Sequence, residues 1–213
     1  MFVVTLLAAL QGLPPSAGDS LASVSIVVNI PAYRLDLLDS GRVVARFPVA
    51  VGLPDYPTPP GRFLVTRVEL NPSWTPPRSP WAAGRSPMPP GPANPMGRAK
   101  MMLMPQYYLH GTPDSLSVGS AASHGCIRLR NRDILQIARR LLASEAPGLA
   151  DSVEAIVGDA RKSRAITLAR AVPVEVRYDL MEVIDGIEIT HPDLYSRGAK
   201  PAPACKPSPR GPP

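Results

Sequence analysis

The alternation of apolar and polar side chains predicts a protein built mainly of β-strands. Residues 24–30 (VSIVVNI) and 33–38 (YRLDLL) are rich in apolar and β-branched side chains, as strands are. A turn signal at 39–41 (DSG) separates them from residues 42–51, whose alternation fits the partner strand of a hairpin. Further strand-like stretches follow at 62–70, 101–104, 106–110, 165–170, 172–178, 180–184 and 187–190.

One segment, residues 132–142 (RDILQIARRLL), has the periodicity of an amphipathic α-helix. Its apolar side chains share one face: Ile134, Leu135, Ala138, Leu141 and Leu142. Asn131 is the expected N-cap residue, and Asp133 carries the charge that favours a helix N-terminus. A weaker helical pattern covers 151–160. The pattern therefore predicts one main helix beside the strands.

Proline interrupts the regular pattern between residues 71 and 97, where nine of the 28 prolines fall. Proline removes a backbone donor and fixes φ, so neither a helix nor a central strand can persist there. Trp74, Trp81 and Met88 lie within this segment. Because disordered segments are poor in tryptophan, we expect a packed loop that forms a lid or wall of a functional site.

The length of 213 residues suits one domain with appendages. We expect the domain over 22–197, with an insertion at 143–165 and a flexible, proline-rich tail at 199–213. Residues 1–19 begin with an apolar run that resembles a secretory signal, although no Lys or Arg precedes Arg34. No window is apolar for long enough to predict a transmembrane helix. The predicted location is outside the cytoplasm, in the periplasm or cell envelope.

Composition narrows the class of partner and excludes some kinds of site. The formal net charge is +6, which favours anionic partners. Aromatic residues make up only 5% of the chain, so no stacking platform is visible and we expect no nucleic-acid partner. The only cysteines are Cys126 and Cys205, which rules out a disulfide framework and a four-cysteine zinc site.

The clearest candidates for chemistry are His110 and the stretch 123–128 (SHGCIR). A thiol becomes a good nucleophile only as the thiolate, and His110 could supply the base for Cys126. A bend at Gly125 would let main-chain N–H groups converge on the oxyanion of a tetrahedral intermediate. Arg128 is close enough in sequence to bind a carboxylate through two hydrogen bonds. These parts together suit acyl transfer through a thioester.

Residue types alone leave other interpretations open. A lone cysteine is most often a small buried apolar residue, and a loop histidine often serves only as a hydrogen-bonding group. His110, His124 and Cys126 could instead be three zinc ligands. Residues at i and i+2 of a tight bend rarely point toward one metal, which disfavours that site.

Residues 108–112 (YLHGT) and 123–129 (SHGCIRL) strongly resemble the signature of bacterial L,D-transpeptidases with a YkuD-type catalytic domain. Other segments resemble the family, mainly its Gram-negative-type members: 58–63, 71–74, 89–97, 172–178, 185–186 and 192–195. The resemblance spans about 24–197 and implies a mostly β, sandwich-like catalytic domain with a cleft, one main helix after the cysteine and a long proline-rich loop. No LysM-like wall-binding module is evident, and Cys205 matches nothing in the family.

The resemblance also implies a role for each residue of the motif. Cys126 would be the acylated nucleophile and His110 its general base, and the main-chain carbonyl of Gly111 would hold the His110 ring. The other implied roles are shaping of the pocket by Ser123 and His124, an oxyanion hole from the N–H groups of Gly125 and Cys126, and binding of a stem-peptide carboxylate by Arg128.

The implied substrate is peptidoglycan with tetrapeptide stems. Cys126 would attack the carbonyl of the third-position diamino acid, release D-alanine and pass the acyl group to an amine of a neighbouring stem. A lysine of an outer-membrane lipoprotein as acceptor would give protein attachment, and water would give an L,D-carboxypeptidase. The sequence leaves these acceptors open, and a non-catalytic wall-binding module is a further alternative. No metal or organic cofactor is implied.

Overall fold

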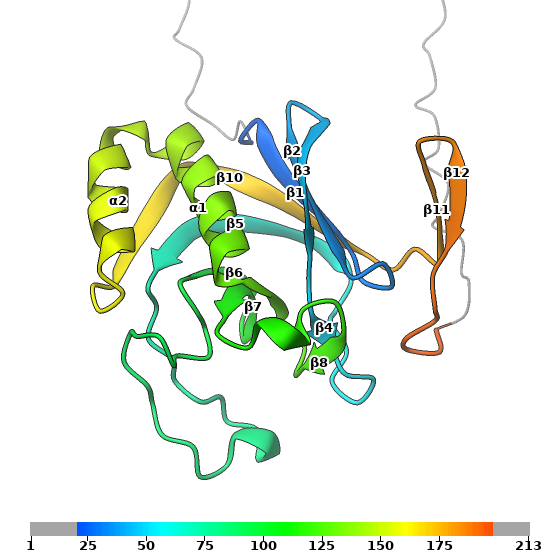
Figure 1. Cartoon of the computed structure of the whole chain (residues 1–213), viewed down its shortest axis with the longest axis horizontal. Helices are drawn as coiled ribbons and strands as arrows, with labels where there is room; N and C mark the ends of the chain where they lie inside the picture. The colour runs from blue at the N-terminus through cyan, green and yellow to red at the C-terminus, as the bar shows by residue number, and fades with distance from the viewer. Residues whose placement is uncertain (1–20, 198–213) are drawn as a thin grey trace, which may run out of the picture.

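The computed structural model describes residues 21–197, except for the side chains of 150 and 151. The predictions made for residues 1–19, for 199–213 and for Cys205 lie outside these described residues. A strongly curved sheet with two α-helices packed against it makes up the body of the molecule (Figure 1).

The main sheet contains eight strands: β1 (Val24–Asn29), β2 (Arg34–Asp39), β3 (Arg42–Pro48), β5 (Gly61–Leu70), β6 (Ala99–Met104), β7 (Tyr107–Thr112), β9 (Ile127–Arg130) and β10 (Arg164–Arg177). Their order across the sheet is β3-β2-β1-β10-β5-β6-β7-β9. Two short strands, β4 (Val51–Gly52) and β8 (Ala121–Ser123), pair with each other in parallel. Ala50 forms a bridge with Arg128 of β9, so the sheet is nearly closed. The predicted mostly β fold is confirmed.

The predicted strands form where the apolar alternation placed them, whereas the short strand β8 was not predicted and others differ in detail. The inward side chains of β1 are almost fully buried: Val24, Ile26 and Val28. The turn at 39–41 joins β2 to β3, which pair antiparallel as predicted. The stretches 165–170 and 172–178 belong to one strand, β10, whose pairing with β5 shifts between Thr167 and Val172.

Strand β9 is another difference, because the sequence predicted a bend before the helix but no strand between them. Ile127 and Leu129 of β9 are fully buried. The strand runs parallel to β7, with Leu109 opposite Ile127. This pairing places Cys126, which immediately precedes β9, beside the strand that carries His110.

Helix α1 (Asn131–Glu145) lies on the core side of the sheet, and its fully buried side chains include Ile134, Ile137, Ala138 and Leu141. The prediction that Asn131 caps this helix was wrong. Asn131 is its first residue, and its side-chain Oδ1 accepts the main-chain N–H of Arg98 at 2.9 Å instead of a helix N–H. The predicted insertion at 143–165 contains the end of α1, a 3-10 turn η3 (Pro147–Leu149) and the helix α2 (Ala150–Gly158).

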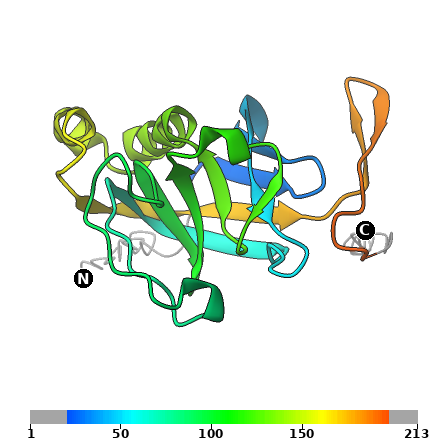
Figure 2. The same cartoon turned by 60° about the horizontal axis from the view of Figure 1, so that its bottom comes forward.

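The proline-rich segment 71–97 is a packed loop, as predicted (Figure 2). Trp74 and Met88 form an antiparallel bridge across it, with two main-chain hydrogen bonds of 2.8 and 2.9 Å. The side-chain amide of Asn94 donates to the carbonyl of Pro89 at 2.8 Å. A 3-10 turn, η1 (Pro80–Ala82), carries Trp81 at the far end of the loop.

Both ends of this loop are fastened to the segment that contains α2. The side-chain amide of Asn71 donates to three main-chain carbonyls at 2.8–3.0 Å, those of Ile156, Asp159 and Lys162. The Asn71 Oδ1 accepts from Arg98 Nε at 2.7 Å, and Arg98 also donates to the carbonyl of Val157. The insertion therefore supports the base of the proline-rich loop.

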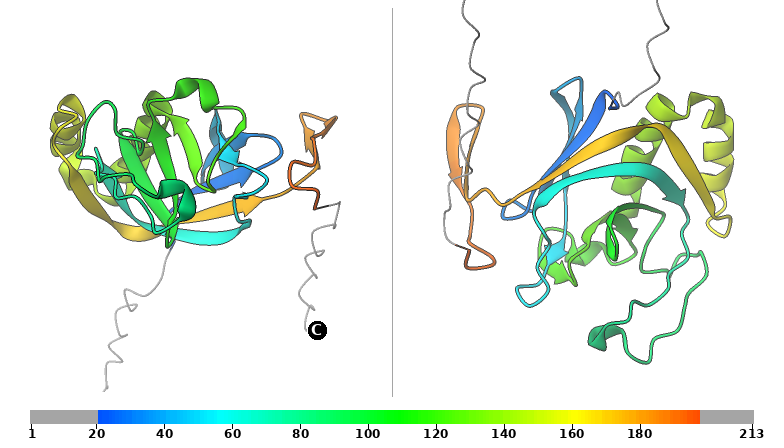
Figure 3. Two further views of the ribbon diagram at one scale, coloured as in Figure 1. Left: turned by 90° about the horizontal axis from the view of Figure 1, so that it is seen from below. Right: turned by 180° about the vertical axis from the view of Figure 1, so that it is seen from behind.

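Beyond β10, strands β11 (Met181–Ile184) and β12 (Ile187–Thr190) form a separate hairpin that stands away from the sheet (Figure 3). Its turn at 185–186 was predicted, and both residues have positive φ. The Glu182 carboxylate joins the hairpin to the body, since it accepts from Arg34 of β2 at 2.7 Å. It also contacts Nε2 of His191, which directly follows the hairpin, at 2.7 Å.

After the hairpin the chain returns to the body at Tyr195. The Tyr195 hydroxyl donates to the carbonyl of Gly52 at 2.9 Å and accepts the main-chain N–H of Thr58 at 3.2 Å. The Thr58 Oγ1 in turn accepts the Gly52 N–H at 2.8 Å. Tyr195 thus fastens the two ends of the loop 52–58. No helix within residues 21–197 has both the length and the hydrophobicity needed to span a membrane.

Candidate active site

Parallel pairing of β7 with β9 brings the two parts of the motif together. His110 lies opposite Arg128 in the register. Paired side chains of parallel strands lie on one face, and alternate residues along a strand share a face. Tyr108 and His110 therefore lie on the face of Arg128, and Cys126 lies two residues before Arg128. Leu109, between Tyr108 and His110, points to the opposite face and is fully buried in the core.

Cys126 is half-buried, with its Sγ 3.6 Å from the main-chain oxygen of Gln106. Burial raises the pKa of the thiol, while a main-chain hydrogen bond from Tyr108 and the positive charge of Arg128 oppose the rise. The thiol is therefore protonated at neutral pH, and it needs a base to become nucleophilic.

His110 is 2% exposed, and its Nδ1 lies 2.6 Å from the main-chain oxygen of Gly111. This is the contact that the family resemblance implied. The pKa of His110 is lowered to about 4, mainly by burial and also by the positive charges of Arg128 and Lys100, against the hydrogen bond to the Gly111 carbonyl, which raises it. The ring is thus neutral at pH 7. Because a carbonyl only accepts, Nδ1 carries the proton and Nε2 has the basic lone pair.

Gly111 has no room for a side chain. A Cβ at this position would lie 2.5 Å from Asn131 Oδ1 and 2.9 Å from Ile134 Cγ2. The start of α1 therefore packs directly against the main chain of β7, and this close contact fixes the carbonyl that holds His110.

The bend before Cys126 is closed by Ser123, which is fully buried. The Ser123 Oγ donates to the carbonyl of Cys126 at 2.6 Å and accepts the N–H of Gly125 at 3.0 Å. Gly125 has a φ of +105°, and a Cβ there would lie 2.5 Å from the Tyr107 ring. Ser123 thus holds the main chain of the bend at both Gly125 and Cys126. The expected role of the Gly125 N–H as an oxyanion donor does not agree with these bonds, because Ser123 already accepts it.

His124 links two loops above the cysteine. Its ring stacks on Trp81 of the proline-rich loop, with centroids 4.1 Å apart and an angle of 14°. Tyr56 of the loop 52–58 packs on it at 4.8 Å and 57°. The His124 Nδ1 is buried with no hydrogen-bond partner in the described part of the chain. Burial lowers the pKa of His124, as do the charges of Arg128 and Arg85, so the stacked ring is neutral.

Arg128 is partly buried, and one of its terminal nitrogens donates to the carbonyl of Ala122 at 3.3 Å. Burial lowers the pKa of the guanidinium, and the neighbouring Cys126 and Asp114 oppose that effect. An arginine nevertheless stays charged at any relevant pH. Its remaining N–H groups are suited to an anionic group bound beside Cys126.

Cys126 opens into a cavity of about 420 Å³, here called the Cys126 cavity. One side comes from the sheet face and the turn next to it: Lys100, Gln106 and Tyr108. The other side comes from the proline-rich loop: Ser73, Trp74, Thr75, Pro76, Pro77, Arg78, Trp81 and Met96. The loop is therefore a wall of the site, as predicted.

Residues 23–175, more than half of the chain, match the family model of the L,D-transpeptidase catalytic domain, YkuD. The chain belongs to the YkuD family. It is 35% identical over 118 residues to "Probable L,D-transpeptidase YbiS" of Escherichia coli, which covers 51% of this chain and 39% of that protein. It is 33% identical over 173 residues to "Probable L,D-transpeptidase YcfS" of the same species, which covers 75% and 52%. The chain thus spans about half the length of the curated relatives it matches.

Solved structures of the same class are similar at lower identity. An L,D-transpeptidase from Mycobacterium smegmatis is 19% identical, with a TM-score of 0.45 over 73% of this chain and 59% of that one. The L,D-transpeptidase LdtMt1 in complex with imipenem is 21% identical, with a TM-score of 0.46 over the same shares.

The YkuD match ends at residue 175, so β11, β12 and Tyr195 lie beyond it. Within the described residues no group of three or more His, Cys, Asp and Glu side chains could hold a metal ion. His110, His124 and Cys126 therefore do not form the zinc site considered as an alternative.

Sequence reasoning missed Gln106 and Lys100 as parts of the site. The only signal was their position: Lys100 adjoins the strand-like stretch 101–104, and Gln106 begins the stretch that ends at His110. The pairing of Lys100 with His110 across β6 and β7 shows that these two side chains share a face of the sheet.

Proposed function

We propose that this YkuD-family protein is an L,D-transpeptidase that acts on peptidoglycan tetrapeptide stems through a thioester on Cys126. Family membership supports the reaction class. The observation that supports the residue assignment is the β7–β9 pairing, in which His110 lies opposite Arg128, two residues after Cys126. Such a substrate places the site of action in the cell envelope.

The first half of the reaction transfers the acyl group of the donor stem to Cys126. His110 takes the thiol proton at Nε2, and the sulfur attacks the carbonyl carbon of the third-position diamino acid. The Cys126 N–H donates to the oxyanion. D-Alanine then leaves with the proton that His110 returns to its amine.

The neutral resting state of both groups suits this step. Separate charges would be poorly solvated in a partly buried site, so the proton passes to His110 as the sulfur attacks. Arg128 lies next to the sulfur and favours the thiolate. The same guanidinium is positioned to bind a carboxylate of the donor stem.

The second half passes the acyl group to an acceptor. An amine of a neighbouring stem gives a crosslink between third-position diamino acids, and a protein lysine gives protein attachment. Water in that place gives an L,D-carboxypeptidase.

The test uses purified protein and tetrapeptide-stem muropeptides. We expect crosslinked dimers and released D-alanine from the wild type, and neither from Cys126→Ala. A carbapenem, whose strained ring acylates thiolates, should add one adduct mass to the wild type and none to Cys126→Ala. Dimers formed by the alanine variant would show that the nucleophile is elsewhere, and monomers with D-alanine released would favour the carboxypeptidase.

A further inference from the structure

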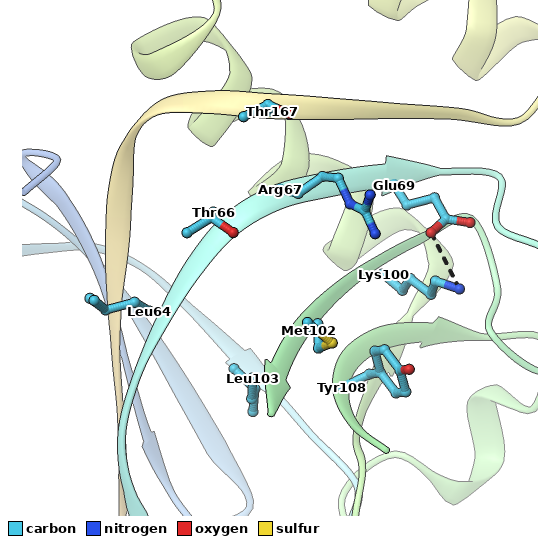
Figure 4. A pocket seen from close by; sticks show the side chains of 9 residues that line it. All are labelled: Leu64, Thr66, Arg67, Glu69, Lys100, Met102, Leu103, Tyr108 and Thr167. Carbon is cyan, nitrogen blue, oxygen red and sulfur yellow. Dashed lines mark ion pairs between the residues drawn. The ribbon is translucent and has the colours of Figure 1, made fainter. Parts of the chain in front are cut away.

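A second cavity, of about 360 Å³, is drawn in Figure 4 and shares two lining residues with the Cys126 cavity. Here it is called the β5–β6 groove. Its lining comes from four strands: Leu64, Thr66, Arg67 and Glu69 of β5, Lys100, Met102 and Leu103 of β6, Tyr108 of β7, and Thr167 of β10. Neither His110 nor Cys126 lines it, so it is a separate compartment.

Lys100 and Tyr108 line both the groove and the Cys126 cavity, so the two cavities adjoin at these side chains. The Lys100 Nζ lies 5.6 Å from the centre of the Tyr108 ring. It also donates to the carbonyl of Ser73, in the proline-rich loop, at 3.4 Å. A molecule bound in the groove would therefore end close to a group attached to Cys126.

The end of the groove nearest the cysteine is charged. Glu69 and Lys100 form an ion pair of 3.3 Å, with side chains that are only 18% and 20% exposed (Figure 4). Arg67 lies two residues before Glu69, and its side chain points into the same space (Figure 4). One carboxylate between two cations is suited to a group that carries both an ammonium and a carboxylate.

The other end of the groove is apolar and uncovered. Leu64 is 52% exposed and Met102 is 51% exposed, and Leu103 adjoins them. Thr66 and Thr167 supply hydroxyls along the side. Large apolar side chains exposed in a groove, together with polar groups that fix orientation, are typical of a ligand site.

We infer that the β5–β6 groove binds the acyl acceptor as a second stem peptide, held by the zwitterionic end of its diamino acid. Glu69 accepts hydrogen bonds from the amine, and Arg67 and Lys100 bind the adjacent carboxylate. The peptide stem lies over Leu64 and Met102. This inference rests on the proposed function and names its second substrate.

The transfer step balances without a further reactant. The bound ammonium first gives one proton to solvent, and the resulting neutral amine nitrogen leaves Glu69 and forms a bond to the acyl carbon of the thioester. The carbon–sulfur bond breaks with its electron pair on sulfur. The proton that the nitrogen loses goes to His110 and then to the Cys126 thiolate. The free thiol is restored and an amide crosslink is formed.

The test separates the two halves of the reaction in Glu69→Gln and Arg67→Gln. Arg62→Gln is the matched control, since Arg62 lies on the same strand, is 87% exposed and lines neither cavity. We expect the two groove variants to lose dimer formation by about tenfold or more, through a raised acceptor KM. Their rate of D-alanine release in the first turnover should stay within about twofold of wild type, and Arg62→Gln should match wild type in both.

A stem tripeptide, which lacks the D-alanine needed by a donor, probes the groove without any reaction. Its binding to Cys126→Ala is measured by calorimetry, alone and combined with Glu69→Gln. We expect the second substitution to weaken binding by about tenfold. Equal binding would overturn the inference even if the proposed function holds.

A loss of acylation in the groove variants equal to the loss of dimers would overturn it too, because the groove would then serve the donor. Tripeptide binding that needs Glu69, in a protein that forms no thioester, would support the groove and refute the proposed function.

Discussion

His110 is buried with its Nδ1 against the Gly111 carbonyl, and burial lowers its pKa to about 4 from an ordinary value of 6.5. The unfolded chain therefore takes up this proton at a higher pH than the folded protein does. By linkage, stability is highest above pH 6.5 and falls as the pH drops from 6.5 toward 4.

Removal of this histidine should reduce that acid sensitivity. We expect the stability of the wild type to fall by about 3 kcal/mol more than that of His110→Gln between pH 7 and pH 4. Urea unfolding of both proteins at several pH values measures the difference. Carboxylates such as Glu182 contribute equally to both proteins and cancel. Parallel curves would mean that His110 is not buried as a neutral ring.

Arg128 should not be replaceable by lysine. Its guanidinium binds the Ala122 carbonyl and still has donors for a carboxylate, whereas lysine keeps the charge but loses the planar pair of donors. We expect Arg128→Lys to lower kcat/KM for the donor stem by about tenfold. Arg130→Lys, on the same strand and paired with Asp133, is the control. An equal kcat/KM in the two variants would show that Arg128 does not bind the donor carboxylate.

The sequence motif predicted several residues of the candidate site. Cys126, His110 and the Gly111 carbonyl could be picked out because their chemistry depends on residue type and local order. The hydrogen bond from Gly125 N–H to Ser123 Oγ could not, since both residues suited an oxyanion hole and only the bend geometry decides which group the N–H meets. Lys100 could not be predicted as part of the site, because it reaches His110 only through the pairing of β6 with β7.

The proline-rich loop is positioned at its tip by His124, whose ring stacks on Trp81. We expect His124→Ala to release this tip, because stacked rings contribute about 0.5–1.5 kcal/mol beyond burial. Hydrogen exchange of the amides around Trp81 should become up to about tenfold faster. His124→Phe keeps an aromatic ring there and should retain most of the protection. Equal exchange in both variants would show that stacking does not hold the loop.

Local patterns predicted the hairpins and α1 but not the order of strands. The turns at 39–41 and 185–186 and the face of α1 depend on neighbours in sequence, and these predictions are confirmed. The four residues of β9 alternate correctly, yet so short a stretch reads equally well as a lead-in to the helix. The pairing of β9 with β7 joins segments that are distant in sequence, and a local pattern of apolar residues cannot predict such a pairing.

The segment beyond the family match is connected to the site through the body of the protein. Tyr195 fastens the loop 52–58, Tyr56 of that loop packs on His124, and His124 stacks on Trp81. The C-terminal part of the described chain thus supports the same wall that the proline-rich loop forms.

Loss of one hydroxyl tests this connection. Tyr195→Phe leaves the Gly52 carbonyl and the Thr58 N–H without their partner, which should cost about 1–2 kcal/mol of stability. We also expect faster hydrogen exchange in residues 52–58 and a raised KM for the donor stem. Tyr178→Phe is the comparison, since the Tyr178 hydroxyl bonds Asp193 and the Tyr195 N–H and does not touch the loop. A change confined to global stability would mean that the loop is held by other contacts.

Lys100 and Tyr108 line two adjoining chambers and form part of the partition between them. A single compound could occupy both, with a thiol-reactive head in one and a zwitterionic tail in the other, joined by a short tether across these two side chains. Resistance to such a compound through substitution at the partition would damage both chambers at once. An inhibitor of this design would therefore leave the enzyme fewer escape mutations than one that fills the cysteine chamber alone.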